Sequence, residues 1–244
     1  MYNKMQLLEV KMKKDVTGII LLAGNSTRYG IYSNKNFELI DNNKTLLDYN
    51  LEVFLNNENI DDVILVIREE DILETYNIIN KYKTDKKIKI INGGNTRKES
   101  VYKALNNTNS EIVIINDCAR PFIKDEYIND LIKETELYWG SSIGVKSKDT
   151  IKICDEEDKV VETTNRNNTW IVQTPQCFNR KVLLYCHNNH LNDQDITDDC
   201  MLLEREGFTI KMVEGDYSNI KLTTIEDLDI IRSINNTKVK KLNK

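Results

Sequence analysis

Short runs of β-branched and other apolar residues alternate with helical patterns through the first two thirds of the chain. Each run has the length of a strand, and the segments between the runs space their apolar residues along one face of a helix. Strands and helices that alternate in this way pack as a parallel sheet with helices on both faces. The sequence therefore predicts an α/β fold with a doubly wound, mostly parallel sheet. The strand-like runs are GIILLA (18–23), VILVI (63–67), KIKII (87–91), EIVIIND (111–117) and SSIGVK (141–146).

The pattern changes after Lys148, where residues 149–165 consist of two short β segments around an acidic turn. Two such segments in succession predict a β-hairpin. The hairpin has little local core to cover its apolar side chains, so we expect it to act as an arm that packs against a second subunit. Exchange of an identical element is a low-cost route to a homodimer. The apolar side chains are Ile151, Ile153, Val160 and Val161.

Length and composition indicate one main domain with short extensions. The chain has 244 residues, of which 40% are hydrophobic and 30% charged, and this suits a single large α/β domain. Residues 1–16 make a poor signal peptide because their apolar patch is short and interrupted by Glu9, so we expect an N-terminal extension. The main domain is expected over 17–236, and a charged, flexible tail over 237–244.

Several classes of function are disfavoured by the sequence. A net charge of −5 argues against general binding to nucleic acid, and no apolar run is long enough to span a membrane. The five cysteines form no CxxC pair, which favours reduced thiols and a cytoplasmic protein. The two histidines form no HExxH motif. The first loop matches neither the GxGxxG fingerprint nor a P-loop, so a dehydrogenase or a P-loop ATPase is unsupported.

Charged and small residues follow the predicted strands at positions that meet at one edge of the sheet. In an open parallel sheet this edge, at the carboxyl ends of the strands, is where ligands bind. Each residue alone has an ordinary explanation, such as a solvated cation, a tight turn or a helix cap. Together, several cations and one aspartate at one rim of an acidic protein predict an anion pocket. The residues are Gly24, Ser26, Arg28 and Lys35, then Gly93, Gly94, Arg97 and Ser100, then Asp117 and Arg120, and finally Gln173, Thr174 and Lys221.

The chemistry that suits such a rim is nucleotide transfer. Backbone N–H groups close to small residues, together with Arg and Lys, can hold a triphosphate in line for attack. An aspartate at a strand end can hold Mg²⁺ that bridges phosphate oxygens. The sequence shows no covalent nucleophile or histidine base, and this chemistry needs neither.

Several motifs then resemble one family. LLAGNSTRYGIYSNKNF is similar to the AAGxGxRMxxxxPKQF loop of sugar- and polyol-phosphate cytidylyltransferases, GGNTRKESVYKAL to their GGxxRxxSVxxGL, and NDCARPF to their HDxARPF. Further segments follow in the family's order, from KDTIK through NRNNTWIVQTPQCF and TDD to VEGDYSNIKLTTIEDL. The match covers about residues 17–232. We therefore identify a resemblance to the IspD/TarI cytidylyltransferases, which have a Rossmann-like nucleotidyltransferase fold.

The resemblance implies an enzyme that moves CMP from CTP to a polyol phosphate and releases pyrophosphate. The chain most resembles members that use 2-C-methyl-D-erythritol 4-phosphate in the non-mevalonate isoprenoid pathway. An alternative is transfer to ribitol 5-phosphate for wall or capsule polymers. A nucleotide-binding module without turnover is a third possibility, which the intact Lys35 and Asp117 disfavour.

Site roles are implied residue by residue. Arg28, Lys35 and Lys221 would be catalytic, and Asp117 would bind Mg²⁺. Ala23, Gly24 and Ser26 would contact the triphosphate, and Gly93, Gly94 and Ser100 the cytosine. Arg120, Thr150 and Arg166 would bind the polyol phosphate, in part across the dimer, and Thr174 is a further substrate-binding position.

The sequence departs from the family pattern at three positions. Ser26 replaces the second glycine of the first loop, Asn34 replaces a proline, and Asn116 replaces a histidine. Asn and Ser are small turn-formers, so we expect the approach to phosphate to be kept.

Overall fold

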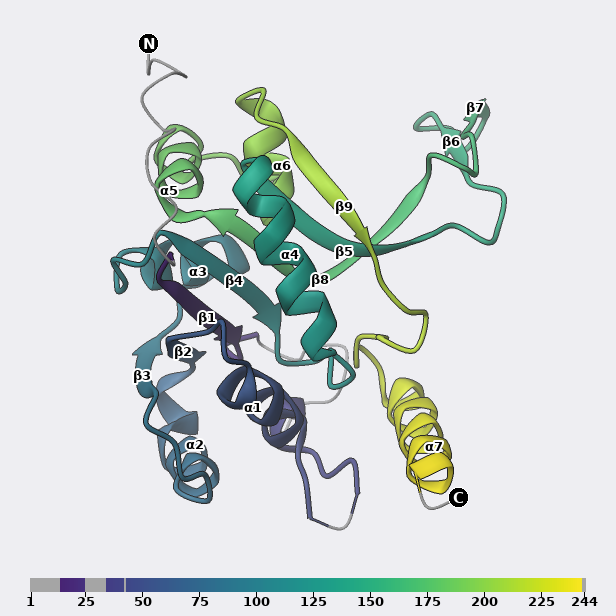
Figure 1. Cartoon of the computed structure of the whole chain (residues 1–244). Helices are drawn as coiled ribbons and strands as arrows, with labels where there is room; N and C mark the ends of the chain where they lie inside the picture. Colours follow the sequence, from purple (N-terminus) through teal and green to yellow (C-terminus); the bar gives the residue numbers. More distant parts are fainter. Residues whose placement is uncertain (1–13, 25–33, 42, 243–244) are drawn as a thin grey trace.

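The computed structural model describes residues 14–24, 34–41 and 43–242. In this part of the chain, seven strands form one sheet in the order β3-β2-β1-β4-β8-β5-β9 (Figure 1). All neighbouring strands are parallel except at β8, which is antiparallel to both β4 and β5. The predicted mostly parallel α/β fold is thus confirmed. The strands are β1 (Val16–Leu21), β2 (Asp62–Ile67), β3 (Lys87–Asn92), β4 (Ile112–Asp117), β5 (Gly140–Lys146), β8 (Trp170–Asn179) and β9 (Ile210–Glu214).

Helices cover both faces of the sheet, and each face has its own apolar cluster. One cluster joins the sheet to α1, α2, α4 and α7, and the other joins it to α3, α5 and α6. The helices are α1 (Leu46–Asn56), α2 (Ile72–Ile79), α3 (Arg97–Leu105), α4 (Asp125–Leu137), α5 (Arg180–Asn189), α6 (Asp199–Arg205) and α7 (Ile225–Leu242). Two short 3-10 helices, η1 (Lys35–Phe37) and η2 (Glu69–Asp71), lie in connecting loops.

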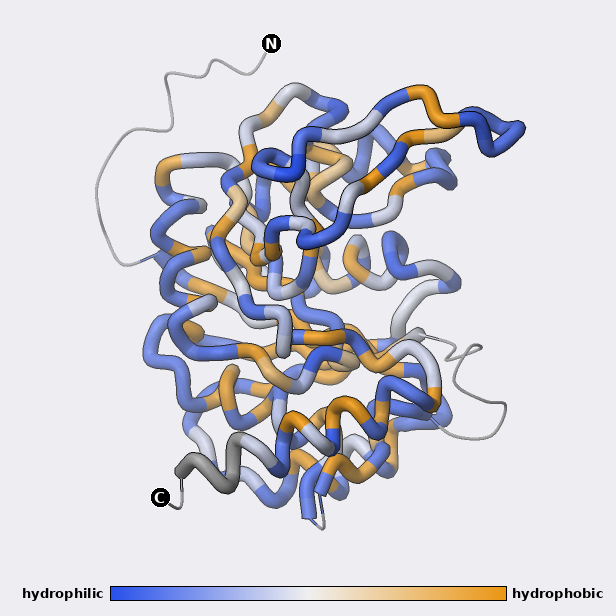
Figure 2. Tube along the Cα trace, turned by 90° about the vertical axis from the view of Figure 1, so that its right-hand side faces the viewer, coloured by the Kyte–Doolittle hydropathy of each residue, from blue (hydrophilic) through white to orange (hydrophobic). Residues whose placement is uncertain are grey.

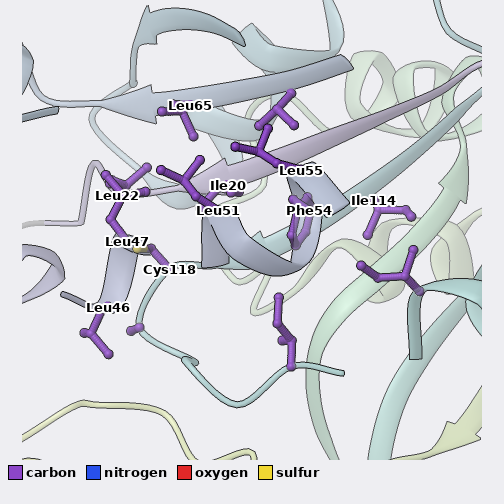
Figure 3. Packing of buried hydrophobic residues seen from close by; sticks show 14 of the residues in the cluster. Ile20, Leu22, Leu46, Leu47, Leu51, Phe54, Leu55, Leu65, Ile114 and Cys118 are labelled. Carbon is purple, nitrogen blue, oxygen red and sulfur yellow. The ribbon is translucent and has the colours of Figure 1, made fainter. Parts of the chain in front are cut away.

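Alternation along β1 explains why one strand serves both faces. Successive side chains of a strand point to opposite faces. Ile20 accordingly belongs to the cluster under α1, whereas Ile19 belongs to the cluster under α3. Helix α1 buries Leu47, Leu51 and Phe54 against this strand, at the spacing of one helical face (Figure 3). The apolar run at 18–23 is therefore buried on both sides, as its composition predicts.

A capping box fixes the start of α1. The Thr45 hydroxyl accepts a hydrogen bond from the Asp48 N–H at 3.2 Å, and the Asp48 carboxylate accepts one from the Thr45 N–H at 2.8 Å. Such reciprocal bonds satisfy backbone donors that the first helical turn leaves free. They fix the first turn of α1, where Leu46 and Leu47 belong to the same apolar cluster as Leu22, just after β1.

The predicted hairpin forms a separate two-stranded sheet. Strands β6 (Lys152–Cys154) and β7 (Val160–Thr163) pair antiparallel and project from the main sheet (Figure 1). Hydrophobic residues lie along this projecting arm (Figure 2), and Val160 and Val161 are 59% and 68% exposed. A single chain therefore leaves the apolar side chains of the arm uncovered.

The end of the chain differs from the expected flexible tail. Helix α7 begins at Ile225 and continues to Leu242, so the boundary expected at 237 falls inside a helix. Leu228 and Ile231 anchor the helix to the core, and a helix already started is extended at little cost. The expected extension over 1–16 lies mostly outside the described residues.

Candidate active site

A pocket of about 290 Å³ opens where β1, β3 and β4 end, at the edge of the sheet that the sequence indicated. This volume is close to the lower end of the range for small-molecule sites. Segments far apart in the chain meet there, from the end of β1 to the loop before α7. Predicted site residues that line the pocket are Ala23, Gly24, Lys35, Gly94, Ser100, Asp117 and Lys221.

Asp117, the last residue of β4, is the electrostatic centre of the pocket. Its Oδ2 accepts a hydrogen bond from Lys221 Nζ at 2.5 Å, and its Oδ1 lies 3.2 Å from Arg97 Nε. Burial disfavours the carboxylate, but the charges of Arg97 and Lys221 outweigh burial and hold the pKa of Asp117 below its ordinary value. Asp117 is therefore ionised at neutral pH, as a metal-binding carboxylate must be.

Arg97 joins this pocket to a second carboxylate behind it. Its Nη1 donates to Asp199 Oδ2 at 2.7 Å, and Asp199 is only 1% exposed. Burial of the guanidinium lowers the pKa of Arg97, but the charges of Asp199 and Asp117 outweigh burial and raise this pKa above its ordinary value. The sequence placed Arg97 at the rim of the pocket but assigned no role to it. Asp199 belongs to the TDD motif and was likewise assigned no role. The contact between them joins α3 to α6, which local pattern does not predict.

Gly93 and Gly94 allow the turn after β3 to approach its neighbours closely. A Cβ atom on Gly93 would lie 2.4 Å from the Ala23 Cβ and 2.9 Å from the Ser100 Oγ. The Gly94 N–H donates to the Ser100 Oγ at 3.0 Å, and the same hydroxyl donates to the Thr96 carbonyl. The loops after β1 and β3 can therefore pack together only if position 93 lacks a side chain.

A family model for "IspD: 2-C-methyl-D-erythritol 4-phosphate cytidylyltransferase" matches residues 16–236. The chain belongs to this family. The 2-C-methyl-D-erythritol 4-phosphate cytidylyltransferase of Clostridium novyi is 43% identical over 219 residues, which cover 88% of this chain and 94% of the relative. The corresponding protein of Clostridium botulinum strain ATCC 19397 is 42% identical, with 86% and 93% covered. The predicted family and the predicted enzyme class, a cytidylyltransferase, are confirmed.

A solved structure agrees with the sequence comparison. The crystal structure of 4-diphosphocytidyl-2C-methyl-D-erythritol synthase from Anaerococcus prevotii matches with a TM-score of 0.83 and 31% identity. The match covers 92% of this chain and 97% of that one. The resemblance thus extends over the sheet and the flanking helices, beyond the motifs that first indicated it.

Two departures from the cytidylyltransferase pattern acquire a structural explanation. Asn34, in place of proline, caps η1: its Oδ1 accepts from the Asn36 N–H at 3.1 Å, and its amide donates to Asp71. This cap holds the turn that carries Lys35, whose Nζ donates to the Leu222 carbonyl at 2.7 Å. The side-chain hydrogen bonds of Asn34 thereby fix the conformation of this turn, as a rigid proline ring would.

Asn116, in place of histidine, is fully buried in a polar network behind Asp117. Its amide donates to Asn50 Oδ1 at 2.6 Å, and its Oδ1 accepts from the Thr174 hydroxyl at 2.8 Å. That hydroxyl in turn accepts from the Asp117 N–H at 3.0 Å. Thr174 thus lies behind Asp117 and supports its backbone, whereas the sequence had placed it among the substrate-binding residues.

The residues expected to bind the acceptor are not gathered at the pocket by the described part of one chain. Arg120 lies half-buried beside it, where Nη1 donates to the Asn219 carbonyl at 2.6 Å. Burial lowers the pKa of Arg120, and the charge of Asp117 opposes that shift. Arg166 and Thr150 contact each other at 3.0 Å on the exposed arm. Ser26 and Arg28 lie outside the described residues.

The donor set around Asp117 fits a magnesium ion that is shared with a nucleotide. Over the described ranges, no group of three or more His, Cys, Asp or Glu side chains could hold a metal by itself. Mg²⁺ commonly uses one or two carboxylates together with substrate phosphates and water. A carboxylate offers about four lone-pair positions, so Asp117 can take a cation while it keeps its bonds to Lys221 and Arg97.

Proposed function

We propose that this chain transfers CMP from CTP to 2-C-methyl-D-erythritol 4-phosphate and releases pyrophosphate, as a step of the non-mevalonate isoprenoid pathway. Membership of the family supports this function. The observation that carries it is the convergence of Lys35, Arg97 and Lys221 around an ionised Asp117 in one pocket. A polyanion is the ligand that such a pocket suits best.

The described cations would act on the phosphates of CTP. Lys35 and Lys221 would stabilise the negative charge that develops as pyrophosphate leaves, a role that Arg28 shares by prediction. A magnesium ion held by Asp117 would neutralise negative charge on the phosphate oxygens. Gly93, Gly94 and Ser100 would hold the cytosine ring by prediction, and the absence of side chains at positions 93 and 94 lets this turn pack closely on Ala23, Glu99 and Ser100.

The acceptor would attack without a covalent enzyme intermediate. A phosphate oxygen of the polyol phosphate forms a bond to the α-phosphorus of CTP, and the bond between the α-phosphorus and the bridging oxygen breaks. Pyrophosphate leaves with the electron pair of that bond. The contribution of the protein is positioning and charge stabilisation, which can supply most of the rate enhancement in such transfers.

We infer that the arm completes the acceptor site of a second subunit. Arg166 and Thr150 would bind the polyol phosphate together with Arg120 of the other chain, so the active form would be a homodimer. The exposed apolar side chains of β7 support this inference, because burying them against a partner is favourable.

We also infer a cytoplasmic enzyme. The five cysteines are all free thiols, which suits a reducing compartment. Within the described residues, no helix combines the length and apolar character that crossing a bilayer requires.

The test is pyrophosphate release from CTP in the presence of 2-C-methyl-D-erythritol 4-phosphate and Mg²⁺. We expect release only when all three are present, and we expect Asp117→Asn, which keeps the shape of the side chain, to abolish most of it. Release that does not depend on the acceptor would indicate a hydrolase. Absence of release from a folded wild-type protein would contradict the proposal.

A further inference from the structure

The feature that the proposed reaction does not use is the buried carboxylate of Asp199. It comes from the first turn of α6, which does not contribute to the lining of the pocket. Its Oδ2 takes the shorter of the two bonds that Arg97 makes to carboxylates, 2.7 Å against 3.2 Å to Asp117. The guanidinium is therefore shared between a carboxylate that faces the pocket and one that does not.

The surroundings of Asp199 keep its charge in place. Burial disfavours the carboxylate, but the charge of Arg97 and the nearby His187 ring outweigh burial and lower the pKa of Asp199. The His187 Nε2 lies 3.6 Å from the Asp199 Oδ1, and both side chains are 1% exposed. A buried charge of this kind is costly unless it is paired, so Asp199 and Arg97 depend on each other.

The charges near the pocket show what this pairing does. Asp117 is contacted by two cations, Lys221 and Arg97, which compete with any metal ion for its oxygens. Within the ion-paired group, Asp199 brings the count to two carboxylates against two cations, and Lys35 and Arg120 add further positive charge around Asp117. Without the charge of Asp199, the positive charge of Arg97 beside Asp117 would be uncompensated and would add to the repulsion of a divalent cation.

We propose that Asp199 is a positioning residue of this site: it holds Arg97 and offsets its charge, so that Asp117 stays available to a divalent cation bound with CTP. The inference rests on the proposed function, in which Asp117 is the metal ligand. Asp199 does not line the pocket, so its influence passes through Arg97.

The alternative is a purely structural role, in which the ion pair only ties α6 to α3. The variant Asp199→Asn distinguishes the electrostatic role from the structural one. Its amide oxygen can still accept a hydrogen bond from Arg97, but the negative charge is removed. The control is Asp195→Asn, which removes an exposed carboxylate that pairs with Arg205. The probe is Mn²⁺ as a spectroscopic substitute for Mg²⁺, with its binding to the CTP-loaded protein measured by electron paramagnetic resonance of the free ion.

We expect Asp199→Asn to weaken Mn²⁺ binding at least about tenfold, because one charge a few ångströms away at an effective dielectric constant near 20 contributes more than the equivalent of one pKa unit. Asp195→Asn should change it less than twofold, since exposed charges are screened. The double variant Arg97→Gln with Asp199→Asn lacks both charges of this ion pair, so no unpaired guanidinium remains. It should recover at least the wild-type affinity for Mn²⁺. This recovery is a result that a structural tether does not produce.

Unchanged Mn²⁺ binding in Asp199→Asn would overturn the inference, and so would a double variant that binds as weakly as the single one. If Asp199→Asn does not fold, the double variant still decides, because it leaves neither charge buried and unpaired. Pyrophosphate release by the wild-type protein is measured alongside. If the wild-type enzyme is active but Asp199→Asn binds Mn²⁺ as tightly as the wild type, only this inference is contradicted. If the wild type is inactive but Asp199→Asn still weakens Mn²⁺ binding, only the proposed function is contradicted.

Discussion

The pocket at the end of β4 and the arm of β6 and β7 differ in how firmly the fold holds their charged residues. In the pocket, Asp117, Arg97 and Lys221 contact one another and are held by a buried polar network. On the arm, the Arg166 guanidinium donates to the exposed Thr150 hydroxyl, and the apolar side chains are uncovered. One chain therefore preorganises the pocket but leaves the arm exposed, and under the proposed function the arm would complete the acceptor half of the site on a second subunit.

The largest expected effect lies in the pocket. Lys35→Ala should lower the turnover number about a hundredfold or more, because it removes a contact to charge that develops in the transition state. The KM for CTP should change far less. Lys133→Ala, on the exposed side of α4, is the matched control and should be neutral. Steady-state kinetics with saturating acceptor would measure both, and an unchanged turnover number for Lys35→Ala would show that it is only a surface residue.

On the arm, the effect should fall on acceptor binding. Arg166→Ala should raise the KM for the polyol phosphate about tenfold or more, the loss expected for a charge-assisted hydrogen bond, and leave the KM for CTP nearly unchanged. Lys152→Ala removes another exposed cation of the same arm and should change neither value. A rise in the KM for CTP of equal size would contradict the division between the two regions.

The proposed contact between subunits can be tested without a change to the pocket. Val161→Glu places a charge on an exposed position of β7, so it should leave the fold of one chain intact but disrupt a dimer that buries it. Light scattering should find dimers of the wild-type protein and monomers of the variant, with activity reduced about tenfold or more. Leu73→Glu, at an exposed position of α2, is the control. A wild-type protein that is monomeric and fully active at micromolar concentration would exclude the exchanged arm.

The smallest effect concerns thiol chemistry. Burial raises the pKa of Cys177 and of Cys186 to about 12, so almost no thiolate is present at pH 8, whereas Cys154 on the arm is exposed. A disulfide reagent should label one thiol per native chain quickly and all five only after unfolding. Rapid labelling of two or more would show that the core of the main sheet opens readily.

The same contrast explains how far the sequence could predict the molecule. Strand runs and helical periodicity predicted the parallel sheet, because each segment buries its own apolar face. Strand ends predicted Lys35, Asp117 and Lys221 together, because parallel strands bring their carboxyl ends to one edge. The role of Asp199 and the network through Asn116 were missed. Their contacts join residues that are far apart in the chain, and neither helix nor strand periodicity relates such residues. The helical end of α7 was missed because charge content was given more weight than helix continuation.

The measurement that tests the account most directly is kcat/KM for CTP-dependent transfer to 2-C-methyl-D-erythritol 4-phosphate and to ribitol 5-phosphate, offered in parallel to the wild-type protein, with ATP as the alternative donor. We predict the higher value for 2-C-methyl-D-erythritol 4-phosphate and poor turnover with ATP. A site built on hydrogen bonds to cytosine rejects a purine that leaves them unpaired. A higher kcat/KM with ribitol 5-phosphate, or comparable turnover with ATP, would contradict the proposed function.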